Sequence, residues 1–429
     1  MVPERLTSVP TILTRPSTPS LTSPPEGSPS ASNIRSLVAS AAKLLGSGVV
    51  SALALTIITS NRWHLLDPGV GISLVLFLQW QAFGLTVTKF GVDQVIFAAI
   101  TDNPHRRVVT TAHMRRRAAP LGLAFSLVVS VVFNPWYGLA CFLSLVLDTQ
   151  SILRLADLNA RERYTSVMTA SLLNYPLFFL LVFGLQVWRP VTIGLALAMF
   201  VMTSVARWAW LSVHRSLHSR LPALSCQGTA LTGVAPLLNF LMFRVDQVLL
   251  GTTVVTTFVA TIGSDFVRQL LFLGRYQELL SGGIAMLTGI LLPRLHLRYP
   301  FSIREILMTA ATRRWLILVH IIGVGLSLAA YTLVWRGAPL PTILLVSVAV
   351  SALLILPANV LTYSMIRQGH LRGLVRNLAV AVAIGLGTIV ASYIFGAPKV
   401  FVIAVPLQLT FFVSLALSSS WLARQHAYE

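Results

Sequence analysis

The feature that most constrains this chain is a succession of long apolar runs separated by short basic connections. An α-helix needs about 20 apolar residues to cross the hydrocarbon core of a bilayer. Because lipid offers the backbone no hydrogen-bonding partners, such runs fold as helices. Hydrophobic residues make up 55% of the sequence and charged residues only 10%, against roughly 25% charged in soluble domains. The sequence therefore predicts an all-α, polytopic membrane protein.

About twelve runs are long enough to span a membrane. Together they leave no room for a soluble catalytic domain, so we do not expect an enzyme of that kind. The predicted spans cover residues 36–60, 69–98, 118–133, 136–153, 165–185, 191–211, 229–251, 266–292, 315–335, 342–365, 378–396 and 401–422. Residues 1–34 are rich in Pro, Ser and Thr and contain no apolar run, which predicts a disordered tail rather than a signal peptide.

The arginines predict how the spans are oriented. Loops after even-numbered spans are basic, whereas loops after odd-numbered spans hold single cations: Arg62, Arg189, Arg336 and Lys399. Basic loops stay on the cytoplasmic side, so both termini are predicted to be cytoplasmic and the protein to lie in the inner (cytoplasmic) membrane. The same bias accounts for most of the net charge of +19 without invoking nucleic acid.

The two halves of the chain resemble each other. Spans one to six and seven to twelve share a rhythm of long and short loops, and the second loop of each half is long and rich in arginine. This pattern predicts two six-helix lobes, residues 35–228 and 229–425, related by a parallel duplication. Two such lobes would enclose a central cavity, and a substrate would bind at the interface of the repeats.

Charges inside the spans are the best functional signal, because each is unfavourable in lipid by about 2.5–3.5 kcal/mol. Lys43 in the first span either lines a cavity or extends to the cytoplasmic surface. Lys89 and Asp93 are spaced to form an ion pair. For Arg207 we expect extension to the surface, and for Asp148 a structural role near Arg154.

The seventh and eighth spans hold the densest charges. Arg244 and Asp246 lie deep in the seventh, and four charges mark one polar stripe at the eighth: Asp265, Arg268, Arg275 and Glu278. At about 100° per residue this stripe covers an arc of about 140°, so it faces protein or water. The stripe either contributes cations to a cavity or consists of two internal ion pairs. We expect Arg244 and Arg268 to face one cavity, with Lys43 nearby.

The segments NFLMFRVDQVLLG and GILLPRL resemble the polysaccharide flippases of the multidrug/oligosaccharidyl-lipid/polysaccharide (MOP) exporter superfamily. The positions that carry the resemblance are Asn239, Asp246, Leu250, Gly251 and Pro293. The resemblance implies that the protein moves a polyprenyl-diphosphate-linked oligosaccharide from the inner to the outer leaflet by alternating access. It implies a cationic cavity, and partners that include a polysaccharide polymerase and glycosyltransferases.

The substrate-binding candidates are Lys43, Arg244, Asp246, Arg268 and Arg275. Arginine suits a diphosphate because its guanidinium donates two parallel hydrogen bonds. No Cys/His cluster has metal-ligand spacing, and we expect no cofactor. Two alternatives stay open. A multidrug antiporter of the same fold would require an acidic cavity. A membrane-embedded glycan polymerase or ligase would require a larger outer loop or a pair of carboxylates.

Overall fold

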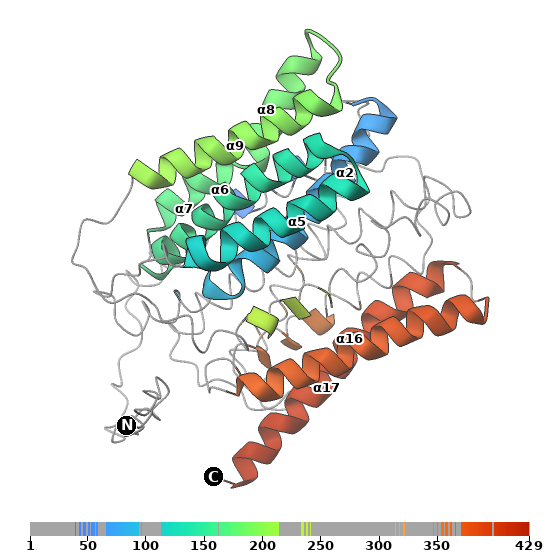
Figure 1. The fold of residues 1–429 in the computed structure, drawn as a ribbon. Helices are drawn as coiled ribbons and strands as arrows, with labels where there is room; N and C mark the ends of the chain where they lie inside the picture. Colours follow the sequence, from blue (N-terminus) through green and yellow to red (C-terminus); the bar gives the residue numbers. More distant parts are fainter. Residues whose placement is uncertain are drawn as a thin grey trace, which may run out of the picture.

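A computed structural model describes residues 66–93, 113–161, 163–213, 370–396 and 399–428, with single positions in 39–58, 96, 233–241 and 314–365. The helices are α2 (Pro68–Lys89), α5 (Ala119–Val132), α6 (Pro135–Ala160), α7 (Tyr164–Leu172), α8 (Tyr175–Gln186), α9 (Ile193–Val213), α16 (Leu371–Ile394) and α17 (Lys399–Tyr428). A π-helical turn, Met114–Ala118, leads into α5. The described part of the chain contains helices and no strand, as Figure 1 shows.

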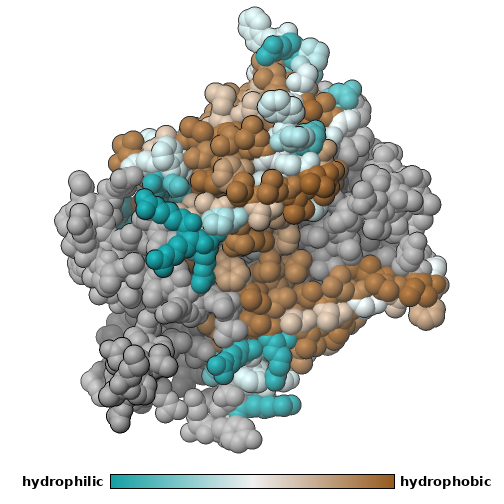
Figure 2. Space-filling model, viewed as in Figure 1, coloured by the Kyte–Doolittle hydropathy of each residue, from teal (hydrophilic) through white to brown (hydrophobic). Residues whose placement is uncertain are grey.

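Five described helical segments are long and apolar enough to cross a membrane: Gly69–Lys89, Pro135–Asn159, Tyr164–Gln186, Ile193–Val213 and Leu371–Ser392. They coincide with five of the predicted spans, and the prediction of an all-α polytopic membrane protein is confirmed. Figure 2 shows the matching surface, with hydrophobic residues over the helices. Large apolar side chains such as Leu127, Val131 and Phe412 are exposed, as expected of a surface that faces lipid.

The structure corrects several predicted boundaries. The fourth span is predicted to end at 153, but α6 continues to Ala160 and includes Arg154. The second span is not one helix to residue 98, because α2 ends at Lys89. The fifth span consists of two helices, α7 and α8, separated at 173–174. The eleventh begins at Leu371 rather than 378, so Arg372 and Arg376 lie on the helix and not in a loop. Hydropathy locates the apolar part of a helix and misses a basic first turn.

Local sequence explains where two helices begin. The Asn134 side chain caps α6 by accepting hydrogen bonds from the backbone N–H groups of Trp136 (3.0 Å) and Tyr137 (3.2 Å). Asp67 caps α2 by accepting from the Gly69 N–H at 2.9 Å. Proline follows each cap, where its fixed φ suits the first turn and its missing N–H is not needed. These caps fix the ends that are predicted to be extracytoplasmic.

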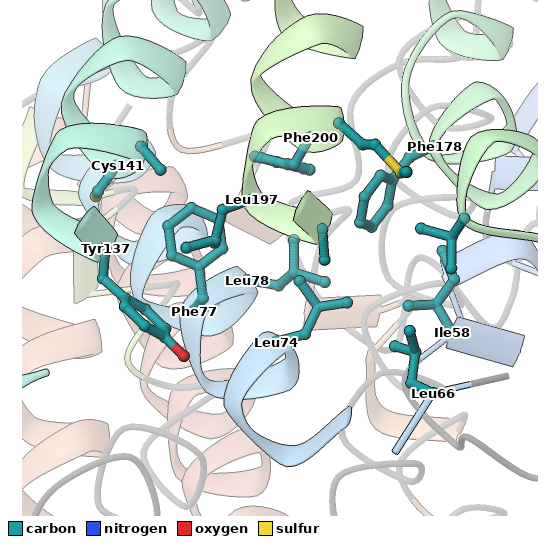
Figure 3. Packing of buried hydrophobic residues seen from close by; sticks show 14 of the residues in the cluster. Ile58, Leu66, Leu74, Phe77, Leu78, Tyr137, Cys141, Phe178, Leu197 and Phe200 are labelled. Atoms are coloured by element: carbon teal, nitrogen blue, oxygen red, sulfur yellow. The ribbon is translucent and has the colours of Figure 1, made fainter. Parts of the chain in front are cut away.

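Helix α6 lies at the centre of the first half and packs against α2, α5, α7 and α9. The core between these helices holds edge-to-face aromatic rings, with Phe77 and Phe200 at 5.6 Å and Phe178 and Phe200 at 5.5 Å between centroids. Figure 3 shows these rings among buried leucines. A side chain on Gly138 would collide with Ser130, so glycine lets α5 and α6 approach closely.

The buried hydrophobic residues form separate clusters in the two predicted halves. Three described clusters contain only first-half residues, and one contains only residues from 235 onward. In the latter, α16 and α17 pack along each other, and Ala235 joins them. The close approach of these helices places the Gly373 backbone against the Trp421 ring. The lobe boundary at 228/229 stays a prediction.

Candidate functional site

The predicted substrate-binding residues are only partly within the described structure. Lys43 lies in a described helical position, whereas Arg244, Asp246, Arg268 and Arg275 lie outside the described residues. Their shared cavity with Lys43 therefore stays a prediction. Within the described residues, the candidate site consists of Lys43 and the buried polar groups of the first half.

The Lys43 side chain is exposed, and its ammonium donates a hydrogen bond to the Thr165 hydroxyl at 3.2 Å. Eight residues later, the Ser51 hydroxyl donates to the Ser171 carbonyl at 3.2 Å. From the first contact to the second, the residue number increases in both helices, so the first span runs parallel to α7. Two odd-numbered spans are expected to be parallel when successive spans cross the membrane in alternating directions. Lys43 is level with the first turn of α7, beside the basic loop that ends at Arg163. It therefore lies near the end of the first span that is predicted to be cytoplasmic.

The second predicted span contains a break in its helix. Helix α2 ends in two consecutive left-handed residues, Phe90 (φ 43°) and Gly91 (φ 71°), after which Val92 and Asp93 are helical again. A left-handed conformation is uncommon for a residue as bulky as phenylalanine. The predicted ion pair is confirmed, since Lys89 Nζ lies 2.9 Å from Asp93 Oδ2 and links the chain on both sides of the break.

The break is held by neighbours from two other elements. The His113 imidazole donates through Nε2 to the Thr88 carbonyl at 3.0 Å, which satisfies a backbone group near the helix end. The hydroxyls of Thr88 and Thr149 on α6 lie 2.7 Å apart. His113 precedes the third span, and burial of its ring lowers its pKa below the ordinary value of 6.5. The neutral ring is the form that fits here.

A buried polar network joins α2, α6 and α9. Asp148 on α6 accepts hydrogen bonds from Gln81 Nε2 at 2.9 Å and from the Ser204 hydroxyl at 3.2 Å. The Arg207 guanidinium lies 3.8 Å from the other carboxylate oxygen, Oδ1. Asp148 and Arg207 are only 2% and 7% exposed, so this is a buried ion pair. Its Asp148 Oδ1 and Arg207 Nε atoms make no hydrogen bond.

This network corrects two expectations from the sequence. Arg207 does not extend to the surface, because it lies buried beside Asp148. Arg154 is not the partner of Asp148; it donates to the Trp208 carbonyl and to the Ser212 hydroxyl instead. One sequence signal was available: Thr203, Ser204 and Arg207 recur at helical spacing and mark a polar, protein-facing stripe on α9.

Every carboxylate in the described part of the chain has an assigned structural partner. Asp67 caps α2, and Asp93, Asp148 and Asp157 pair with Lys89, Arg207 and Arg161 respectively. Lys43 differs from those three cations, since its described contact is a hydroxyl. Among the described residues, the arrangement therefore offers a cation to a ligand and no unpaired carboxylate.

Neither a protein-family profile nor a curated protein sequence matches this chain. A solved structure does: a multidrug resistance MATE family transporter of the MOP superfamily, in an outward-facing conformation. The match covers 91% of this chain and 96% of the other, with 10% sequence identity and a TM-score of 0.54. At that identity the likeness concerns the fold alone, and the chain has the fold of this MOP-superfamily transporter along nearly its whole length.

Proposed function

We propose that the protein is a transporter that moves a polyprenyl-diphosphate-linked oligosaccharide from the inner to the outer leaflet by alternating access. The fold that it shares with a MOP-superfamily transporter over 91% of the chain supports the class of function. The partners of the described charges support the class of substrate. The lipid's diphosphate is anionic, and its sugars present hydroxyl groups.

The observation that carries the proposal is the difference between Lys43 and the described carboxylates. A cationic substrate needs a carboxylate that is free to receive it, and the four described carboxylates are engaged in caps or ion pairs. Among the described residues, the hydrogen bond of Lys43 goes to the Thr165 hydroxyl, which a phosphate oxygen can replace as the acceptor. A charge-assisted hydrogen bond to phosphate is stronger than one to a neutral hydroxyl.

The position of Lys43 suits the first contact with a lipid-linked substrate. The diphosphate of such a lipid lies at headgroup depth, and Lys43 lies level with the first turn of α7 beside Arg163. In this proposal Lys43 attracts the diphosphate at the cytoplasmic end. Arg244, Arg268 and Arg275 bind it further in, and Asp246 positions Arg244. Glycosyltransferases would supply the substrate and a polysaccharide polymerase would receive it.

A multidrug antiporter is the second candidate, favoured by the likeness in fold to a multidrug resistance transporter. It would require a cavity with a free carboxylate for cationic drugs. Efflux of a cationic dye by the purified protein, abolished by a carboxylate substitution in the seventh or eighth span, would establish it. A glycan polymerase or ligase would instead form a new glycosidic bond, which a transporter does not.

The experiment is depletion of the protein in its own cells, followed by analysis of lipid-linked saccharides. We expect a polyprenyl-diphosphate saccharide to accumulate on the cytoplasmic leaflet. Complementation with Lys43→Arg should relieve the accumulation, because the cation is kept, whereas Lys43→Gln should relieve it only in part. Thr165→Val is the matched control, since it removes the hydroxyl partner and keeps the ammonium. No accumulation of any lipid-linked saccharide would contradict the proposal.

A further inference from the structure

The break after α2 meets the second half of the chain. A Cβ atom added to Gly233 would collide with the Phe90 ring, so the ring packs directly on the Gly233 backbone. Phe90 belongs to the first half, and Gly233 lies near the start of the predicted seventh span, 229–251, in the second half. The described hydrophobic clusters divide between these halves, and this contact crosses the division.

The described residues at the start of the seventh span contact both halves. At about 100° per residue, Ala235 and Leu238 lie roughly 140–200° around the helix from Gly233. Ala235 and Leu238 pack in the cluster with α16 and α17. Gly233 faces the other way, against Phe90. The described start of this span therefore packs in the second half through Ala235 and Leu238 and touches the first half through Gly233.

Phe90 is held rigidly in the first half. The Lys89–Asp93 ion pair links the two sides of the break, and His113 and Thr149 hold Thr88. Beyond the break, Val92 and Ile96 are buried against the π-helical turn and α6. The left-handed backbone turns the ring out of the path of a continuous helix. The Phe90 ring therefore keeps its position within the first half, and a movement of one half relative to the other must change the contact between the ring and the Gly233 backbone.

Chain direction places this contact at one end of the membrane. Helix α2 begins after the first loop, which is predicted to be extracytoplasmic, so Phe90 lies at its cytoplasmic end. The seventh span follows a basic loop and starts at that same end, which puts Gly233 there too. Two independent parts of the sequence therefore bring both residues to the cytoplasmic side of the lobe interface.

We propose that Phe90 and Gly233 form a latch that closes the cytoplasmic side between the two halves. The inference deepens the proposed function, on which it rests, by naming the contact that must open to admit substrate from inside. Only glycine fits at 233 because any side chain would displace the ring. When the halves separate at this side, the ring leaves the Gly233 backbone and the interface between the halves opens toward the cytoplasm.

The test is a disulfide across the latch, in protein whose Cys141 and Cys226 are replaced by alanine. The pair Phe90→Cys with Gly233→Cys is oxidised in lipid nanodiscs. Spin labels on ketone-bearing amino acids at the exposed positions 163 and 372 report the distance between halves. Gly122→Cys with Leu145→Cys is the control pair: both positions lie in the first half, and a Cβ at 122 lies 4.0 Å from Leu145 Cβ, within disulfide reach.

We expect two distance populations without the latch disulfide, only the shorter one with it, and both again after reduction. The control disulfide should leave both. Failure of the latch disulfide to form, a single population before oxidation, or two populations after it would each overturn the proposal. The readout needs no substrate, so it succeeds or fails independently of what the protein carries.

A second pair of variants guards against loss of folding. Gly233→Ala should shift the populations toward the longer distance, and adding Phe90→Leu should reverse the shift by making room for the methyl group. Gly184→Ala has open space around it and should change nothing. Unchanged populations in Gly233→Ala would overturn the latch.

Discussion

The Asp148 carboxylate and the Arg207 guanidinium lie 3.8 Å apart, from Oδ1 to Nη1, with both side chains buried between α6 and α9. Such a pair exerts its largest effect when one partner is lost, because the remaining charge stays buried without compensation. Gln81 and Ser204 stabilise the carboxylate further. The network therefore holds three helices of the first half in register.

Substitution of one partner should destabilise the protein more than substitution of both. Arg207→Met should lower the free energy of unfolding by about 3–5 kcal/mol, as for other buried pairs that lose one member. Arg207→Met with Asp148→Leu should recover much of that loss. Thermal unfolding in detergent measures both, with Arg163→Met, an exposed arginine, as control. Equal destabilisation by the single and double variants would contradict a coupled pair.

Glycine substitutions should separate helix contacts from helix propensity. Gly138→Ala should destabilise by about 1–3 kcal/mol, because the methyl group collides with Ser130 on α5. Gly184→Ala on α8 meets nothing within 4 Å and should be neutral or stabilise by up to about 1 kcal/mol. Thermal unfolding of the two proteins side by side tests this. Equal effects would mean that α5 and α6 are not as close as described.

His113 should make stability depend on pH. Burial of the ring lowers its pKa below the ordinary 6.5, and Arg117 acts in the same direction, whereas the Thr88 carbonyl and Asp93 oppose them. Below pH 6.5 the unfolded chain binds a proton that the folded chain resists, so stability falls as the pH falls through that window. At higher pH His113 no longer makes stability depend on pH, because its imidazole is neutral in both the folded and the unfolded state.

The variant His113→Gln removes the contribution of His113 to the pH dependence of stability. Glutamine keeps an N–H donor for the Thr88 carbonyl and cannot be protonated. Melting temperatures between pH 7.5 and 5 should decline less steeply in the variant than in the wild type. Parallel declines would show that other groups, and not His113, set the acid sensitivity.

Reporter fusions test the orientation. A cytoplasmic reporter should be active after Arg163, before α7, and a periplasmic phosphatase should be active after Arg189, between α8 and α9. The arginine bias between loops predicts this pattern. An extracytoplasmic signal at Arg163 would invert the membrane topology and move the Phe90–Gly233 contact to the outer side.

Sequence patterns predicted the helical class and the positions of five described spans because hydropathy over about 20 residues is a local property. The Lys89–Asp93 pair was predictable for the same reason, since its members are four residues apart. The Asp148–Arg207 pair was not, because it depends on how α6 and α9 rotate against each other. Span hydropathy alone likewise gave no sign that Phe90 would end a helix in a left-handed conformation.

The candidate site was predicted only in its local parts. The environment of Lys43 depends on the register between the first span and α7, which the Thr165 and Ser171 contacts define. Sequence spacing within a single span carries no information about that register. The charges of the seventh and eighth spans, Arg244 and Arg268 among them, stay predictions.

The most direct test of the proposed function is translocation of a defined probe, a polyprenyl-diphosphate-linked N-acetylglucosamine, in vesicles containing the purified protein. The fraction of probe open to a membrane-impermeant oxidant outside is followed while the potential is set to either sign. Moving each negative charge out of a negative interior is favoured by about 2.3 kcal/mol per 100 mV. We predict movement faster than in protein-free vesicles, more probe outside when the interior is negative, and slower movement with Lys43→Gln. Movement no faster than in protein-free vesicles, with export of a cationic dye by the same preparation, would contradict the account.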